Sequence, residues 1–211
     1  MKQIVIMGAG GFARELMWLI ESLGNWNILG FIRSDKSGVR EQLHGYPNYP
    51  TMKDFLDNHT LNHPIYYAFG VGSPAVKKLM DTEARLSGLT IAPPLIYPSV
   101  NIHRSIDLHD GVVICAGTTL TVDISIGYGT MLNLHCTVGH DTVIGEYCTF
   151  SPGVHISGNV HVENTVECGT NSSVIPNVTL GEGCIIGAGA AVVRSIPAGK
   201  IAVGIPAKVR E

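Results

Sequence analysis

From position 102 to position 192, an apolar residue recurs at every sixth position without interruption. The series is Ile102, Leu108, Ile114, Leu120, Ile126, Leu132, Val138, Ile144, Phe150, Ile156, Val162, Cys168, Val174, Leu180, Ile186 and Val192. A period of six matches neither an α-helix, near 3.6, nor a half-buried strand, at 2. It predicts a parallel β-helix of hexapeptide repeats, in which each unit is one short strand and a corner. A β-sandwich with regular turns would not keep this register.

Three hexapeptides make one coil of about 18 residues, so residues 18 apart are expected to stack in columns. One such column would contain Leu132, Phe150, Cys168 and Ile186. A smaller residue lies two positions before each member of the series and is expected to fill the tighter interior space. Glycine often follows the large residue, and we expect it to give the backbone freedom that a corner needs. These glycines are Gly127, Gly139, Gly145, Gly169, Gly181 and Gly187.

The chain changes character near residue 96, after Pro93 and Pro94. Residues 1–95 alternate strand and helix patterns, with strands expected at 3–7, 28–32 and 65–69 and helices at 12–23, 52–56 and 74–86. This alternation predicts a small, Rossmann-like α/β domain with a parallel sheet. Residues 96–211 form the predicted β-helix domain. Its last segment, residues 196–209, is expected to cap the apolar end of the solenoid.

A glycine-rich loop follows the first predicted strand. Gly8, Gly10 and Ala13 match the G-x-G-x-x-G/A pattern between a strand and a helix. Backbone N–H groups at such a helix N-terminus suit a phosphate, and Asp35 follows the second strand. Because the domain is about half of a full dinucleotide fold, we favour a nucleotide or nucleotide-sugar over NAD. A tight turn that binds nothing is the alternative interpretation.

His140 is the candidate general base of the repeats. It lies two residues after an interior position, near a corner, and the residue one coil later is Gly158, which would leave space beside the imidazole. Either Asp141 or Asp123, which are 18 residues apart, could orient the ring. A solvated surface histidine is the alternative. The competing candidate bases are His135 and His155.

Composition narrows the possible partners. The formal net charge is −3, with no strong basic patch, so nucleic acid is not expected as a partner. No apolar run reaches the ~18 residues of a membrane span, and the N-terminus does not read as a signal peptide. We therefore expect a cytoplasmic protein without a membrane partner. All five cysteines lie in the repeat region without a Cys-x-x-Cys pair, which favours neither a disulfide framework nor a metal site.

Four segments together carry a family resemblance: the hexapeptide series, TVGHDTVIGEY at 137–147, IVIMGAGGFARE at 4–15 and AVGIPAKV at 202–209. The chain resembles the bacterial sugar acetyltransferases, in their two-domain branch. That branch includes N-acetyltransferases of nucleotide-activated amino-sugars and sialic acid O-acetyltransferase-like proteins. The resemblance covers essentially the whole chain.

The resemblance implies a left-handed coil, although right-handed crossovers are the general rule. It also implies a homotrimer with active sites between neighbouring β-helices, and direct acetyl transfer from acetyl-CoA with no acyl-enzyme and no bound cofactor. His140 matches the general base, Asp141 the residue that raises its basicity, and Asn133 a polar position beside it. The expected acetyl-CoA contacts are Thr149, Gly158, Thr170 and Ala188. The expected nucleotide-sugar contacts are Gly8, Gly10, Gly11, Phe12, Asp35 and Gly70. Many members carry His where this chain has Phe12.

We therefore predict an acetyl-CoA-dependent acetyltransferase acting on the amino group of a nucleotide-linked amino-sugar, such as a 4-amino-4,6-dideoxyhexose. Its product would supply cell-surface glycans such as lipopolysaccharide or capsule. O-acetylation of a sugar such as sialic acid is the close alternative, because a base histidine serves either acceptor. A non-catalytic β-helix binding protein and an NAD-dependent enzyme are the alternatives from other classes.

Overall fold

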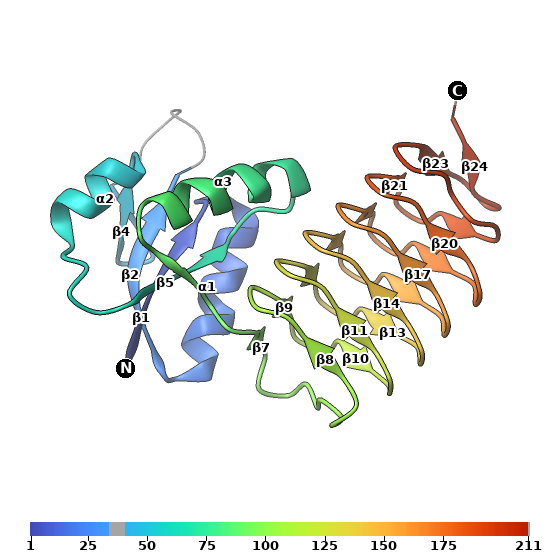
Figure 1. Cartoon of the computed structure of the whole chain (residues 1–211), viewed down its shortest axis with the longest axis horizontal. Coiled ribbons are helices and arrows are strands. Elements are labelled where there is room, and N and C mark those ends of the chain that lie inside the picture. The colour runs from blue at the N-terminus through green and yellow to red at the C-terminus, as the bar shows by residue number, and fades with distance from the viewer. Residues whose placement is uncertain (34–40, 211) are drawn as a thin grey trace. The chain divides into compact units, whose positions relative to one another are not determined.

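A computed structural model describes residues 1–33 and 41–210 of the chain (Figure 1). The chain forms two compact units, Met1–Pro93 and Pro94–Glu211. The first is an α/β unit and the second is a parallel β-helix, so the predicted fold class is confirmed.

The α/β unit is built around one sheet with the strand order β3-β4-β2-β1-β5-β6, parallel except between β3 and β4. Its elements are β1 (Lys2–Met7), α1 (Gly11–Leu23), β2 (Trp26–Ile32), β3 (Gln42–Leu43), β4 (Tyr46–Tyr49), α2 (Met52–Asn58), β5 (Ile65–Phe69), α3 (Pro74–Leu86) and β6 (Thr90–Ile91). The three expected long strands and all three helices are present. The short strands β3, β4 and β6 were missed, because two to four residues carry no readable alternation.

Two glycines let the carboxyl ends of β1 and β5 approach each other. Gly8 adopts φ +120°, and a Cβ built on it would lie 2.8 Å from the carbonyl oxygen of Gly70. A Cβ on Gly70 would in turn lie 2.7 Å from Ala13 Cβ and from Ile6 Cγ2. Helix α1 therefore packs directly against the strand ends, which is the close contact that glycine permits.

Three parallel sheets form the sides of the β-helix (Figure 1). One side contains β7 (Leu95–Ile96), β9 (Val113–Ile114), β12 (Met131–Leu132), β15 (Thr149–Phe150), β18 (Glu167–Cys168), β21 (Ile185–Ile186), β23 (Ile201–Val203) and β24 (Lys208–Val209). The second contains β10 (Thr119–Leu120), β13 (Thr137–Val138), β16 (His155–Ile156), β19 (Ser173–Val174) and β22 (Ala191–Val192). The third contains β8 (Asp107–Leu108), β11 (Ser125–Ile126), β14 (Val143–Ile144), β17 (His161–Val162) and β20 (Thr179–Leu180).

The predicted stacking at 18 residues is confirmed. Leu132 pairs with Phe150, Phe150 with Cys168, and Cys168 with Ile186. All four side chains are at most 1% exposed. The interior series therefore makes one continuous apolar core along the coils, which stabilises the β-helix by removing apolar area from water.

The structure corrects our expectation that the glycines after the large residues provide the backbone freedom of the corners. From Leu108 to Ile186, the left-handed backbone lies three residues after each large residue, and it is often not glycine. The positions are Gly111, Gly117, Asp123, Gly129, His135, Asp141, Tyr147, Gly153, Asn159, Thr165, Asn171, Asn177, Gly183 and Gly189. The glycines directly after the large residues have no positive φ; a Cβ on Gly139 would lie 2.5 Å from the backbone nitrogen of Gly158. They are needed for close approach between coils, not for turning.

The last segment closes the solenoid. Strand β23 continues the stacking by pairing in parallel with β21, and β24 then turns back antiparallel to β23. All five cysteines are buried within the β-helix as thiols. Among residues 1–33 and 41–210, no helix has the length and apolar character needed to cross a membrane.

Candidate active site

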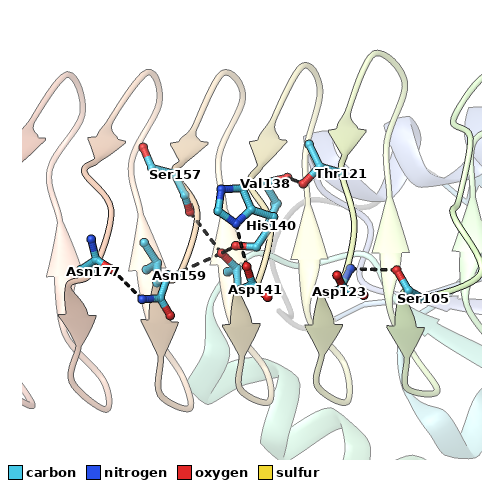
Figure 2. Close-up of polar contacts among 11 residues, drawn as sticks. Ser105, Thr121, Asp123, Val138, His140, Asp141, Ser157, Asn159 and Asn177 are labelled. Carbon is cyan, nitrogen blue, oxygen red and sulfur yellow. Dashed lines mark hydrogen bonds and ion pairs between the residues drawn. The ribbon is translucent and has the colours of Figure 1, made fainter.

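His140 and Asp141 form a hydrogen-bonded pair at the corner between β13 and β14 (Figure 2). The Nδ1 atom of His140 lies 2.7 Å from Oδ2 of Asp141. The side chains of His140 and Asp141 are 64% and 60% exposed, so both are in contact with solvent. A carboxylate at Nδ1 fixes the tautomer that keeps Nε2 unprotonated and able to accept a proton.

Gly158 lies directly beside the free edge of the imidazole. A Cβ built on Gly158 would be 2.6 Å from Nε2 of His140, so only glycine leaves this atom its present position. The backbone N–H of Gly158 donates to no acceptor among the residues that the structure describes. A proton acceptor and a buried N–H donor that has no acceptor among the described residues therefore lie next to each other, one coil apart.

The structure distinguishes between the two carboxylates that sequence spacing left open. Asp123 and Asp141 both adopt left-handed backbone, with φ of 56° and 57°. Asp141 contacts the imidazole, whereas the polar contact of Asp123 is from its own N–H to Oγ of Ser105, at 2.8 Å. Asp141 is thus the residue in place to orient His140.

Two further residues hold the backbone of His140, and sequence reasoning missed both. The N–H of Asn159 donates to the His140 carbonyl at 2.7 Å. Thr142 Oγ1 lies 3.5 Å from the same carbonyl and donates to the Ser157 carbonyl at 3.1 Å. Asn159 could have been found by its place one coil after Asp141, the same relation that singled out Gly158.

The competing histidines have no carboxylate partner among residues 1–33 and 41–210. His155 pairs through Nδ1 with Thr137 Oγ1 at 2.9 Å on the outer face of its sheet. His135 is an exposed corner residue with φ 57°, stacked over Gly117. Neither is arranged as His140 is, with one nitrogen on an acid and the other beside an available N–H.

The remaining residues predicted for the acetyl-CoA side lie on another part of the coil. Thr170 and Ala188 are exposed and stack at the corner that follows β18 and β21. Asn133, the polar position predicted beside the base, follows β12 on this same side and is 8% exposed; its Oδ1 accepts from the Leu134 N–H at 2.7 Å. Thr149 is buried on β15. Within one chain, a full side of the coil separates this group from His140.

The glycine loop of the α/β unit is the second candidate site. Gly10 is the N-cap of α1 and Gly11 its first residue; both are exposed, and a Cβ on Gly10 would meet nothing within 4 Å. The first turn of α1 contains no acidic residue, and no side chain caps it. This leaves backbone N–H groups facing open space, as a phosphate site requires.

The other residues predicted for this loop have different environments. Gly8 and Gly70 are buried packing positions, and Phe12 is half-buried at the start of α1. They shape the loop from beneath, while Gly10 and Gly11 present its surface. Asp35 lies outside the described residues.

Comparison with known proteins finds one family model and several solved structures that are similar to this chain. Residues 3–82 match the PglD N-terminal domain family. WeeI from Acinetobacter baumannii is 29% identical, with a TM-score of 0.89 over all of both chains. PerB from Caulobacter crescentus, solved with CoA and GDP-perosamine, is 27% identical, with a TM-score of 0.88 over 100% of this chain and 98% of that one. The acetyltransferase domain of PglB from Neisseria gonorrhoeae, solved with acetyl coenzyme A, is 26% identical, with a TM-score of 0.87 over 99% of each.

The matches to curated sequences are shorter. A protein of Staphylococcus aureus strain COL, whose name assigns it provisionally to the acetyltransferases, is 42% identical over 57 residues. That segment is 27% of this chain and 29% of the relative's length.

Proposed function

We propose that this chain, which is similar to two-domain hexapeptide-repeat sugar acetyltransferases, transfers an acetyl group from acetyl-CoA to the amino group of a nucleotide-linked amino-sugar. The observation that carries the proposal is the His140–Asp141 pair beside the available N–H of Gly158. The glycine loop at α1 supplies the place for the acceptor's phosphates.

The reaction needs one base and one oxyanion donor. The neutral amine attacks the thioester carbonyl, and Nε2 of His140 takes the amine proton as the C–N bond forms. The carbonyl oxygen becomes an oxyanion and accepts from the Gly158 N–H. Collapse of this intermediate breaks the C–S bond, and the imidazolium returns its proton to the CoA thiolate. Asp141 stabilises the imidazolium throughout and is not itself protonated.

The separation of the two residue groups on the coil supports a homotrimer. His140 lies on one corner, and the positions expected to bind acetyl-CoA, Thr170 and Ala188, lie on another. A site that contains both needs the second corner from another copy of the chain. A closed threefold ring gives every copy one complete site. We expect a trimer by sedimentation; a monomer at working concentration would falsify this arrangement.

The acceptor distinguishes the proposed reaction from its alternative. CoA release is measured across nucleotide-linked 4-amino-sugars, the matching free sugars and sialic acids. We expect turnover only when both the amine and the nucleotide are present, because the loop binds the phosphates and the dyad serves the amine. Turnover with sialic acid in place of the amino-sugars would instead indicate O-acetylation. Acetyl-CoA is a cytoplasmic metabolite, so we place the reaction in the cytoplasm.

A further inference from the structure

The left-handed residues on the His140 corner form a column along the coils. Asp123, Asp141, Asn159 and Asn177 occupy successive coils, with φ between 56° and 63° (Figure 2). Asn159 Nδ2 donates to Asn177 Oδ1, at 2.5 Å. The carboxylate of Asp141, by contrast, contacts His140, the residue before it in the chain.

The column changes from acid to amide at the proposed reaction centre. Carboxylates occupy it at Asp123 and Asp141, and amides occupy it at Asn159 and Asn177. The change falls at Gly158, the residue immediately before Asn159. Backbone preference does not explain it, because Asp and Asn both tolerate left-handed backbone. A carboxylate at position 159 would lie about 5 Å from Asp141, one strand spacing away. It would also lie next to the Gly158 N–H, which donates to the oxyanion in the proposed reaction.

The backbone of Asn159 contacts that of His140 through the bond that left-handed residues make along the coils, as Tyr147 does with Tyr128. Its N–H donates to the His140 carbonyl at 2.7 Å, while its side chain is held by Asn177 one coil further on. A chain of two contacts thus runs from Asn177 through Asn159 to the backbone of His140. Both asparagines are exposed, so the amide–amide contact adds little to fold stability and acts through geometry.

We propose that Asn159, held by Asn177, is a positioning residue of the acetyl-transfer site. It fixes the His140 corner and keeps the column uncharged beside the Gly158 N–H. The inference rests on the proposed function. It identifies a residue that sets both the alignment of the base and the local charge on the side where the oxyanion forms.

Charge variants test the electrostatic half of the proposal. Three variants each add one carboxylate at a left-handed corner. Asn159→Asp places it next to the His140–Asp141 dyad, Asn177→Asp places it one coil further away, and Asn171→Asp places it on a different corner. We expect Asn159→Asp to raise the pKa of His140, because a carboxylate added next to the dyad favours the charged imidazolium. Asn177→Asp should raise it less and Asn171→Asp not at all. Equal pKa values in all three variants would overturn the proposal.

The pKa of His140 is followed by NMR titration of the imidazole C–H signals, assigned with His140→Ala. The other titratable groups around the corner are Asp123 and Asp141 in the column, and His155 and His161 on the flanking strands β16 and β17. Their charges are common to all three variants, so differences between variants report the added carboxylate. The titration needs no substrate, so it stands even if wild-type protein releases no CoA. Absence of CoA release by the wild-type protein would count against the proposed function, whereas the titration tests this inference separately.

Turnover tests the positioning half. Asn159→Gly keeps the left-handed backbone and the N–H contact to His140 but removes the contact to Asn177. We expect a five- to tenfold lower kcat with unchanged KM values, unchanged His140 pKa and unchanged Tm. Asn159→Asp should lose at least as much kcat, because its carboxylate opposes the oxyanion. Wild-type kcat in Asn159→Gly would show that the amide column does not position the base.

Discussion

The two units of this chain build their candidate sites from different materials. In the β-helix the site consists of side chains, His140 and Asp141, presented on a corner that recurs with the coil. In the α/β unit the site consists of backbone at the open N-terminus of α1, shaped by Gly8 and Gly70. The site in the β-helix depends on contact between His140 and Gly158, which are 18 residues apart. The site in the α/β unit depends on contact between Gly8 and Gly70, which are 62 residues apart. Periodic folds therefore reveal their site geometry in the sequence, and layered α/β folds do so much less.

Glycine shows the same contrast. In the β-helix, Gly158 is required because an imidazole lies where its Cβ would be. In the α/β unit, Gly70 is required because α1 packs against it, whereas Gly10 has open space around it. Of these three glycines, Gly10 is the one with open space for a ligand. The following changes test that contrast, from the largest expected effect to the smallest.

Replacing the base should have the largest effect. We expect His140→Ala to lower kcat by ~10²–10⁴, the range of a lost general base. The fold should be unaffected, because the side chain is 64% exposed and outside the apolar series. Asp141→Asn should cost less than His140→Ala, and His155→Ala should be close to wild type. Wild-type turnover in His140→Ala would move the base elsewhere on the coils.

Displacing the base without removing it should cost somewhat less. In Gly158→Ala, the new methyl group would meet Nε2 of His140 at 2.6 Å, and the ring must move. A shift of about 1 Å can cost on the order of 10²-fold in turnover. Val122→Ala is the control, in the same column, one coil before His140 and two before Gly158, and 38% exposed. Full activity in Gly158→Ala at an unchanged Tm would mean that Nε2 does not take the proton.

A substitution in the glycine loop should change substrate binding alone. We expect Gly10→Val to raise the KM for the nucleotide-sugar by about tenfold and to leave kcat and the KM for acetyl-CoA unchanged, since it removes uniform binding. The fold tolerates this change, because Gly10 has an ordinary φ of −81° and no neighbour within 4 Å.

Gly70→Val is the contrasting variant, because it should destabilise the α/β unit by overpacking against Ala13 and Ile6. An increase in the KM for acetyl-CoA in Gly10→Val would instead assign the loop to the donor. Unchanged KM values for both substrates would make the loop a structural turn.

The β-helix should weaken in mild alkali. All five cysteines lie there, and burial raises the pKa of Cys136 to about 11 and that of Cys184 to about 12. Raised thiol pKa values give stability that is complete below about pH 9, the ordinary value, and is lost as pH rises towards 11. We expect about 1 kcal/mol per thiol to be lost by pH 10.

Denaturant unfolding at pH 8 and pH 10 measures this loss. Cys136→Ala should show a smaller difference between the two pH values than wild type. Equal differences would mean that Cys136 does not contribute to the alkaline loss.

Sequence alone predicted the α/β unit, the β-helix, the 18-residue stacking and the inward residues. It did so because the interior of a coil must be apolar at fixed intervals. It misjudged the corners, because Asp123, His135 and Tyr147 show that the left-handed position need not be glycine. It also missed Asn159, although the 18-residue spacing places this residue one coil after Asp141.

What the sequence determined by itself is the register: a period of six fixes which residues face inward and which share a column, and it places His140 on a corner with Gly158 one coil on. What only the tertiary structure decided is which atoms meet. Asp123 and Asp141 are equivalent by spacing, and the direction of the side chain makes Asp141 the partner of His140. Gly8 and Gly70 both look like loop glycines, and only their contact across two strands shows that they pack the chain. Spacing is set by local, repeating backbone geometry, whereas contacts depend on rotamers and on long-range packing.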